Sequence, residues 1–328
     1  MPKTTTHSIK RIALIGGGVI GAGWAARALA AGLEVRVFDP QASAPARMDE
    51  ILNLAWPSLK ALKLAKGTIP RKKLRFCASL AETLEAADFV QENAPDREAL
   101  KIDLIAEMDG LLPPTVPISS SSSTFLPSRL QSKCKHPERV LCGHPFNPVY
   151  LMPLCEIVAG AKTKEPALAA AEALYKRFGM HTLRLKKEID SYLANRLQNV
   201  VWDEMMRLIK EGVASPEDMD QAMAYGPGLR WAFWGPTQIY HLAGGDGGMR
   251  HFLEHFRDKL SMTQAQEKTM IQGAERMANG LGIRGLERQR DAALVAIIKA
   301  LAPLQIGPGT VLARPRAARK GPAKVKGS

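Results

Sequence analysis

The sequence has few cysteines, no long hydrophobic run and no apolar leader. Its cysteines, Cys77, Cys134, Cys142 and Cys155, are too scattered for a disulfide framework or a zinc site, so we expect reduced thiols and no metal. No run of about 18 apolar residues occurs, as a membrane helix requires. Residues 1–10 are polar, unlike the core of a secretory signal. We therefore expect a cytoplasmic protein with no membrane partner.

The chain is long enough for two hydrophobic cores, and its positive charge is unevenly distributed. A length of 328 residues with 46% hydrophobic residues favours two globular domains. The net charge is +13, but the final segment, residues 313–328, adds Arg and Lys without any acidic residue, among Pro and Gly. This composition predicts a disordered basic tail rather than a folded reader of nucleic acid. Nucleic-acid binding through the tail is the less favoured alternative, and we expect no nucleic-acid partner.

Short β-branched or apolar runs alternate with helical patterns through the first half of the chain. This alternation predicts an α/β domain of the Rossmann type with a mostly parallel sheet. Ser79 and Asp96 are expected to begin helices, the second over residues 97–112, and Pro166 stands in a first helical turn. The expected strands are residues 12–15, 34–38, 74–77, 89–92, 116–119, 140–144, 154–158 and 181–185.

The strand patterns largely stop after residues 186–188. Leu193, Leu197, Val200 and Met205 recur at helical spacing, which predicts one long amphipathic helix from about Ser191. An all-helical C-terminal domain is expected to follow. The domains are therefore set at residues 1–187 and 188–312, before the tail at 313–328. The apolar face of the long helix can pack inside the subunit or against a second copy of the chain.

A glycine-rich sequence joins the first expected strand to the first expected helix. It reads Gly16-Gly17-Gly18-Val19-Ile20-Gly21. In this context Gly16 permits a tight turn, Gly18 lets the backbone approach a pyrophosphate and Gly21 lets the helix pack closely on the sheet. Asp39 ends the next strand, where its carboxylate can accept hydrogen bonds from ribose hydroxyls and repel a 2′-phosphate. We therefore expect a dinucleotide site for NAD rather than NADP.

A histidine and a glutamate lie in successive expected strands further along the chain. His144 ends residues 140–144, and Glu156 lies in residues 154–158, with prolines in the link between them. A neutral imidazole can take a hydroxyl proton while a carboxylate on its other nitrogen orients it. A structural His and Glu pair fits the same residues equally well.

The sequence His144-Pro-Phe-Asn147-Pro, followed by Glu156, resembles the signature of the 3-hydroxyacyl-CoA dehydrogenase superfamily. The resemblance extends to about Leu301 and implies an NAD domain, a helical dimerising domain and a His-Glu dyad. It implies that His144 is the base and Glu156 its orienting partner, and that Ser123 and Asn195 bind the substrate oxygen or the histidine. The serine run also allows Ser121 or Ser122 in that role. The resemblance further places Glu92, Arg97, Ser123 and Asn147 near the nicotinamide half of NAD.

A cluster of aromatic residues stands between glycines in the second domain. Trp231, Phe233 and Trp234 follow Arg230, and the flanking glycines suggest a loop that feeds a helix. Aromatic faces attract quaternary ammonium groups, although packing of the domain interior explains such a cluster as well. This segment, together with residues 242–252 and 91–97, resembles the L-carnitine 3-dehydrogenases. The resemblance implies that the rings hold the trimethylammonium group of L-carnitine and that Arg196 or Arg230 holds its carboxylate.

The sequence leaves other interpretations open. The substrate can instead be a short 3-hydroxyacyl-CoA, such as 3-hydroxybutyryl-CoA, or a sugar acid such as L-gulonate, oxidised by the same dyad. A non-catalytic NAD-binding structural protein is a more remote alternative, against which His144 and Glu156 argue. Oxidation of the 3-hydroxyl of L-carnitine to 3-dehydrocarnitine, by a homodimer that uses NAD, is the interpretation that the resemblance favours.

Overall fold

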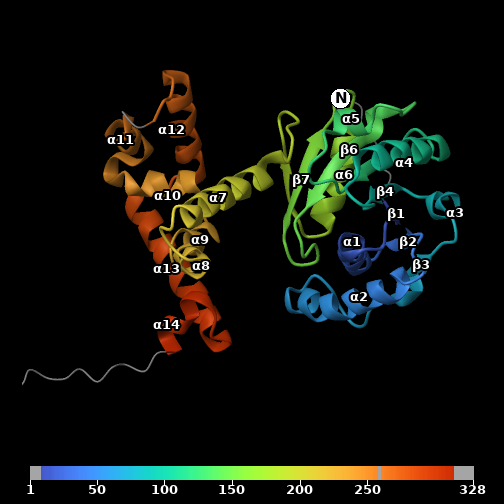
Figure 1. Ribbon diagram of the computed structural model, residues 1–328, viewed down its shortest axis with the longest axis horizontal. Coiled ribbons are helices and arrows are strands. Elements are labelled where there is room, and N and C mark those ends of the chain that lie inside the picture. Colours follow the sequence, from blue (N-terminus) through green and yellow to red (C-terminus); the bar gives the residue numbers. More distant parts are fainter. Residues whose placement is uncertain (1–8, 258–259, 314–328) are drawn as a thin grey trace, which may run out of the picture. The chain divides into compact units, whose positions relative to one another are not determined.

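The computed structural model describes residues 9–257 and 260–313, and the chain divides into two compact units (Figure 1). The first unit extends to Val201 and the second begins at Trp202. The division therefore falls inside one long helix, α7 (Tyr192–Lys210), later in the chain than the boundary drawn at residue 187 from the sequence. Residues 314–328 of the expected basic tail lie outside the described residues.

The first unit is built on a sheet of eight strands in the order β3-β2-β1-β4-β5-β6-β7-β8. Neighbouring strands run parallel except β6 and β7, which are antiparallel. The predicted mostly parallel sheet is therefore confirmed. The strands are β1 (Arg11–Ile15), β2 (Glu34–Phe38), β3 (Leu74–Phe76), β4 (Phe89–Glu92), β5 (Ile118–Ser120), β6 (Val140–Pro145), β7 (Leu154–Ala159) and β8 (His181–Arg184).

Helices cover both faces of this sheet. One face packs against α1 (Val19–Ala30), α2 (Ala44–Ala61) and α6 (Glu165–Arg177), and the other against α3 (Leu80–Leu84), α4 (Glu98–Leu111) and α5 (Pro127–Leu130). Along β1, Ile12 and Leu14 join the first hydrophobic cluster while Ala13 and Ile15 join the second. Side chains of a strand alternate between faces, so a strand buried on both faces reads as a continuous apolar run.

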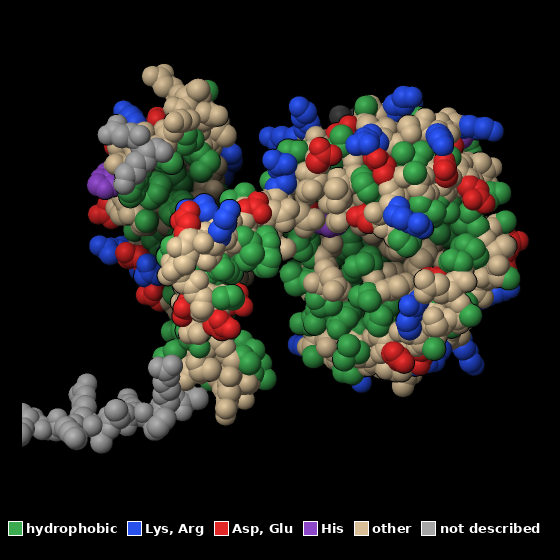
Figure 2. Space-filling model, viewed as in Figure 1, with side chains coloured by type: hydrophobic (Ala, Val, Ile, Leu, Met, Phe, Trp, Pro, Cys, Tyr) green, Lys and Arg blue, Asp and Glu red, His purple; other side chains and the backbone are tan. Residues whose placement is uncertain are grey.

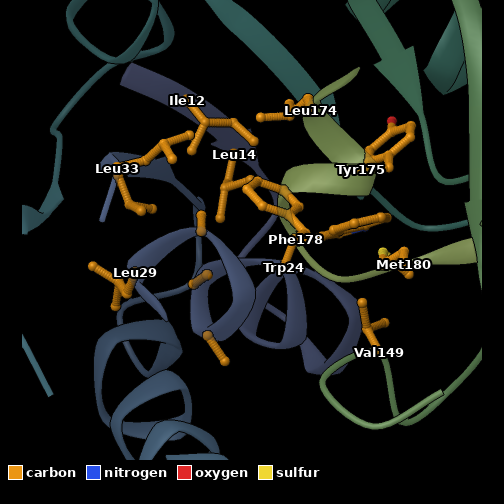
Figure 3. Packing of buried hydrophobic residues seen from close by; sticks show 14 of the residues in the cluster. Ile12, Leu14, Trp24, Leu29, Leu33, Val149, Leu174, Tyr175, Phe178 and Met180 are labelled. Carbon is orange, nitrogen blue, oxygen red and sulfur yellow. The ribbon is translucent and has the colours of Figure 1, made fainter. Parts of the chain in front are cut away.

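Aromatic rings organise the cluster on the α1 face (Figure 3). The ring of Trp24 in α1 lies 5.1 Å from that of Tyr175 in α6 and 6.2 Å from that of Phe178, between centroids. Trp24 and Tyr175 are completely buried. These contacts hold α1, the helix that follows the glycine-rich turn, against α6.

Two expected element boundaries are wrong for local reasons. The strand expected from residue 116 begins at Ile118, because the amide of Val116 bonds back to the carbonyl of Pro113 and Pro117 has no N–H to donate. The helix expected to open at Asp96 has Arg97 as its N-cap, without a side-chain cap. Ser79 does cap α3, where its hydroxyl accepts from the amide of Glu82.

The second unit is helical throughout its described residues. The aromatic segment expected as a loop contains a short helix, α9, which ends at Trp231. Among the described residues, no helix combines the length and apolar composition needed to span a membrane. The helices after α7 are α8 (Pro216–Tyr225), α9 (Pro227–Trp231), α10 (Pro236–Ala243), α11 (Gly248–His255), α12 (Gln264–Ala278), α13 (Ile283–Leu301) and α14 (Thr310–Ala313). Short 3-10 helices among the described residues are η1 (Arg71–Lys73), η2 (Pro137–Arg139), η3 (Gly245–Gly247), η5 (Ala302–Leu304) and η6 (Gly307–Gly309).

Candidate active site

The glycine-rich turn between β1 and α1 needs its glycines for space. A Cβ on Gly16 would lie 2.6 Å from the carbonyl oxygen of Asn93, and one on Gly21 would lie 2.0 Å from that of Gly16. Gly16 also has a φ of +99°, which side chains rarely adopt. A Cβ on Gly18 would instead point into open space, beside the uncapped first turn of α1. The turn therefore leaves room for a pyrophosphate at a helix N-terminus, as NAD requires.

Asp39 fastens this turn to the end of β2. One carboxylate oxygen accepts from the amide of Gly17 at 2.7 Å, and the other accepts from the amide of Gln41 at 2.8 Å. Each oxygen has two lone pairs, so one on each remains for a ligand. Asp39 thus lies beside the glycine-rich turn, as expected for a carboxylate that binds ribose.

His144 and Glu156 face each other across the antiparallel strands β6 and β7. The distance between His144 Nδ1 and Glu156 Oε2 is 2.9 Å. The imidazole is nearly buried, at 5% exposure, and its centroid lies 5.2 Å from that of Phe146 and 5.3 Å from that of Tyr192. Two aromatic rings therefore pack close to the imidazole, and its bond to Glu156 gives Nδ1 a defined direction.

The first turn of α7 binds the second oxygen of Glu156. The amides of Leu193 and Ala194 each donate to Glu156 Oε1 at 3.0 Å. Ser191 and Tyr192 precede them with positive φ angles of 60° and 51°, which turn the chain into the helix. Both carboxylate oxygens are thus engaged, and the carboxylate can only present one orientation to His144.

A cavity of about 540 Å³ lies in the first unit at the carboxyl ends of the parallel strands. Several of the residues expected at the active site line it, namely Ile20, Ser123, His144, Asn147 and Asn195. The amide of Asn195 donates to the carbonyl of Ser123 at 3.3 Å. The cavity therefore brings the glycine-rich turn, the serine run and the histidine together.

The hydrogen bonds of the serine run distinguish its members. Ser121 donates to Asn93 and accepts from Trp24 and Gln91, so its hydroxyl has no capacity left. Ser122 is buried and does not line the cavity. Ser123 lines it and donates to Asp96 at 3.0 Å, which leaves its oxygen able to accept. Ser123 is therefore the serine with free hydrogen-bonding capacity.

Glu92 and Arg97, two of the expected cofactor residues, are not among the residues that line the cavity. Glu92 is completely buried, where it accepts from Lys101 Nζ at 2.8 Å, from the amide of Ala94 and from Ser120. Arg97 is exposed and does not line the cavity. The wall instead carries residues that sequence reasoning did not assign to the site, namely Asn93, Asp96, Lys101, Phe146 and Gln198.

The aromatic segment lies in the second unit. Phe233 and Trp234 line a cavity of about 120 Å³ there together with Arg230 and Arg290. Arg290 pairs with Asp291, whereas Arg230 has no ion-pair partner among the described residues. Trp231 is 40% exposed and is not part of this wall. Arg196, on α7 in the first unit, is exposed.

A parallel sheet with a glycine-rich cradle, an acidic residue after β2 and a confined imidazole at the same edge is the arrangement of a nicotinamide-dependent dehydrogenase. Comparison with known families agrees. Residues 11–189 match the 3-hydroxyacyl-CoA dehydrogenase NAD binding domain, and residues 192–283 match the C-terminal domain of the same family. The chain belongs to the 3-hydroxyacyl-CoA dehydrogenase family. It is an NAD-dependent oxidoreductase that acts on a CH–OH group.

Curated relatives of the chain are named for a more specific activity than that of the family. The chain is 42% identical to the L-carnitine dehydrogenase of Pseudomonas aeruginosa, in an alignment that covers 89% of this chain and 94% of that protein. It is 40% identical to the L-carnitine dehydrogenase of Bacillus cereus, with 90% and 93% covered.

Solved structures share the architecture. A 5-formyl-3-hydroxy-2-methylpyridine 4-carboxylic acid 5-dehydrogenase is similar with a TM-score of 0.71 and 28% identity, over 89% of this chain and 98% of that one. The 3-hydroxybutyryl-CoA dehydrogenase of Escherichia coli is similar with a TM-score of 0.61 and 27% identity, over 84% of this chain and 59% of that one.

Proposed function

We propose that this protein oxidises the 3-hydroxyl group of L-carnitine to give 3-dehydrocarnitine, with NAD as the hydride acceptor. Support comes from relatives named L-carnitine dehydrogenase at about 40% identity over some nine-tenths of the chain. The observation that carries the chemistry is the bond of 2.9 Å between Glu156 and His144, which lines the cavity.

His144 is proposed as the general base. Glu156 Oε1 already accepts two amide hydrogens, and an ionised carboxylate can only accept, so the proton of the imidazole belongs on Nδ1. Nε2 then keeps the lone pair that takes the proton of the alcohol. As that O–H bond breaks, the C–H bond delivers its hydride to NAD, and the alcohol becomes a ketone.

Ser123 and Asn195 are proposed to hold the substrate oxygen beside His144. Asn195 Nδ2 gives one hydrogen to the carbonyl of Ser123 and has a second for the substrate oxygen, and the Ser123 hydroxyl would turn from Asp96 to donate to the same oxygen. For NAD, the proposed contacts are Gly16 to Gly21, Asp39 and Asn147. Glu92 and Arg97 remain proposals as well. Glu92 would act through Lys101, which it binds and which lines the cavity.

Substrate recognition is proposed to involve Arg196, Arg230 and the rings of Trp231, Phe233 and Trp234. Two guanidinium groups share the small cavity of Phe233 and Trp234, so its chemistry suits the carboxylate of carnitine rather than its cation. The exposed face of Trp231 is the better candidate for the trimethylammonium group. Replacing Arg230 by Ala should then raise the KM for carnitine and leave the KM for NAD unchanged.

We also propose a cytoplasmic homodimer. The four cysteines are free, as is usual in a reducing compartment. Hydrophobic side chains lie on the surface of the helical unit (Figure 2), and exposed Leu197, Val200 and Trp202 follow one another along α7. Apolar surface of this kind is typical of a subunit interface.

The test is the initial rate of NADH formation with L-carnitine, D-carnitine, 3-hydroxybutyryl-CoA and L-gulonate. We expect kcat/KM to be highest for L-carnitine. A higher value for 3-hydroxybutyryl-CoA or L-gulonate would identify that alcohol as the substrate, and the proposed oxidation by NAD would still hold. No NADH formation with any of the four alcohols, from a protein that binds NADH, would support the non-catalytic alternative.

A further inference from the structure

A chain of buried polar groups leads from the core of the first unit to the cavity. Ser119, Tyr175 and Gln91 are completely buried, and the Tyr175 hydroxyl lies 2.7 Å from Ser119 Oγ and 2.6 Å from Gln91 Oε1. Burial raises the pKa of Tyr175 well above its usual range, so the phenol keeps its proton. Tyr175 therefore donates to Gln91, and Ser119 donates to Tyr175.

The direction of these bonds fixes the next group. Because Gln91 Oε1 accepts from Tyr175, its amide nitrogen is the donor that reaches Ser121 Oγ at 2.8 Å. Trp24 Nε1, which can only donate, reaches the same oxygen at 3.0 Å. Ser121 receives two hydrogens, so its own proton must go elsewhere.

That proton goes to Asn93. Ser121 Oγ lies 2.8 Å from Asn93 Oδ1, and Asn93 Nδ2 donates to the backbone oxygen of Gln91 at 3.0 Å. The amide of Asn93 is thereby held in one orientation, with the oxygen toward Ser121. An amide nitrogen carries two hydrogens, and the second has no acceptor among the described residues.

This unbonded hydrogen of Asn93 lies beside the glycine-rich turn. Asn93 lines the cavity that contains His144, and a Cβ on Gly21 would lie 3.5 Å from its Nδ2. We propose that Asn93 is a binding residue whose remaining Nδ2–H donates a hydrogen bond to an oxygen of the bound dinucleotide. This inference rests on the cofactor of the family and not on the proposed alcohol.

The experiment is a fluorescence titration of NADH, without any alcohol, on the full chain and two variants. Asn93→Ala removes the donor and the side-chain volume, and Asn93→Leu removes the donor but keeps the volume. We expect both to raise the Kd for NADH by roughly 3- to 10-fold, as the loss of one hydrogen bond predicts. Asn53→Ala, a change to an exposed amide on α2, is the matched control and should leave the Kd unchanged.

Circular dichroism shows whether each variant is folded, and Asn93→Leu keeps the test available if Asn93→Ala does not fold. A Kd of Asn93→Leu within about twofold of the parent would mean that Asn93 only fills space, which overturns the proposal. Because NADH binding is measured without substrate, a wrong choice of alcohol cannot produce this result.

Discussion

At the scale of single residues, Glu156 is the most constrained group of the active site. It lies opposite His144 in the strand register, and its other oxygen is bound by two amides of α7. A side chain held from two elements cannot follow the imidazole if the ring turns. The imidazole therefore takes its orientation from a fixed acceptor.

Replacing His144 by Gln should lower kcat by roughly 10²- to 10⁴-fold, because a positioned general base contributes about that much. Glu156→Gln should also lower kcat, since an amide no longer selects the imidazole tautomer. The Kd for NADH should stay within about threefold of the parent in both variants, because neither residue belongs to the glycine-rich turn. Unchanged turnover of His144→Gln would contradict the proposed base.

Sequence could identify the dyad more readily than the rest of the wall. His144 and Glu156 lie in strands, where a position in the sequence determines a face and an edge. Glu92 and Arg97 were expected at the cavity, whereas Asp96 and Lys101 line it. The chain leaves β4 at Glu92 and enters α4 only at Glu98. Sequence does not reveal how such a connection bends, so it could not tell which of these charged groups faces the ligand.

At the scale of elements, a buried ion pair ties α4 to the start of β6. The guanidinium of Arg139 in η2 bonds Asp109 of α4 at 2.6 and 2.9 Å, and both side chains are almost completely buried. Burial by itself would raise the pKa of Asp109, but bonds from Arg139 and from the amides of His136 and Lys135 outweigh it and lower that pKa. The strand that carries His144 thus begins at a charged anchor.

This anchor should make stability depend on pH in the acid range. Because the pKa of Asp109 is lower in the folded chain, its contribution is present above its unfolded pKa of about 3.9 and is lost as pH falls through the folded pKa. Asp109→Asn should cost about 3 kcal/mol or more at pH 7, since it leaves Arg139 buried without a counter-charge. Chemical denaturation at a series of pH values should show this deficit shrinking below about pH 4.

The control is Asp103→Asn in the same helix. Asp103 pairs with Lys133, and both side chains are more than half exposed. Such a pair contributes about 0 to 1 kcal/mol, so this variant should follow the parent at every pH. Equal effects of the two substitutions would show that burial does not increase the contribution of the Arg139–Asp109 pair to the free energy of unfolding.

At the scale of the whole molecule, the sequence predicted the mostly parallel sheet of the first unit and the helical character of the second. Strand alternation indicated the sheet, because two-sided burial leaves continuous apolar runs such as Ile12 to Ile15. The helical unit was harder to predict. Periodicity along α7 indicates which side chains share a face, but it does not state what covers Leu197, which is 63% exposed.

We propose that a second copy of the chain covers this apolar face of α7. Leu197→Glu and Val200→Glu place a charge on the apolar face of α7 and should convert a dimer to a monomer, because an unpaired charge in an interface must lose its water. Light scattering during size-exclusion chromatography should show the mass fall to half. Asn199→Glu, on another face of the helix, should remain dimeric. A parent protein that elutes as a monomer would rule the proposal out.

The two amides that α7 gives to Glu156 also limit how this protein can be recombined. A chimera that exchanged everything after β8 would replace Ser191 and Tyr192, whose positive φ angles lead into the turn that aims two amides at the glutamate. A fusion point near Val201 would keep that turn with the sheet it serves. New alcohol specificities should therefore be grafted downstream of the first three turns of α7, where the graft leaves the imidazole's partner intact.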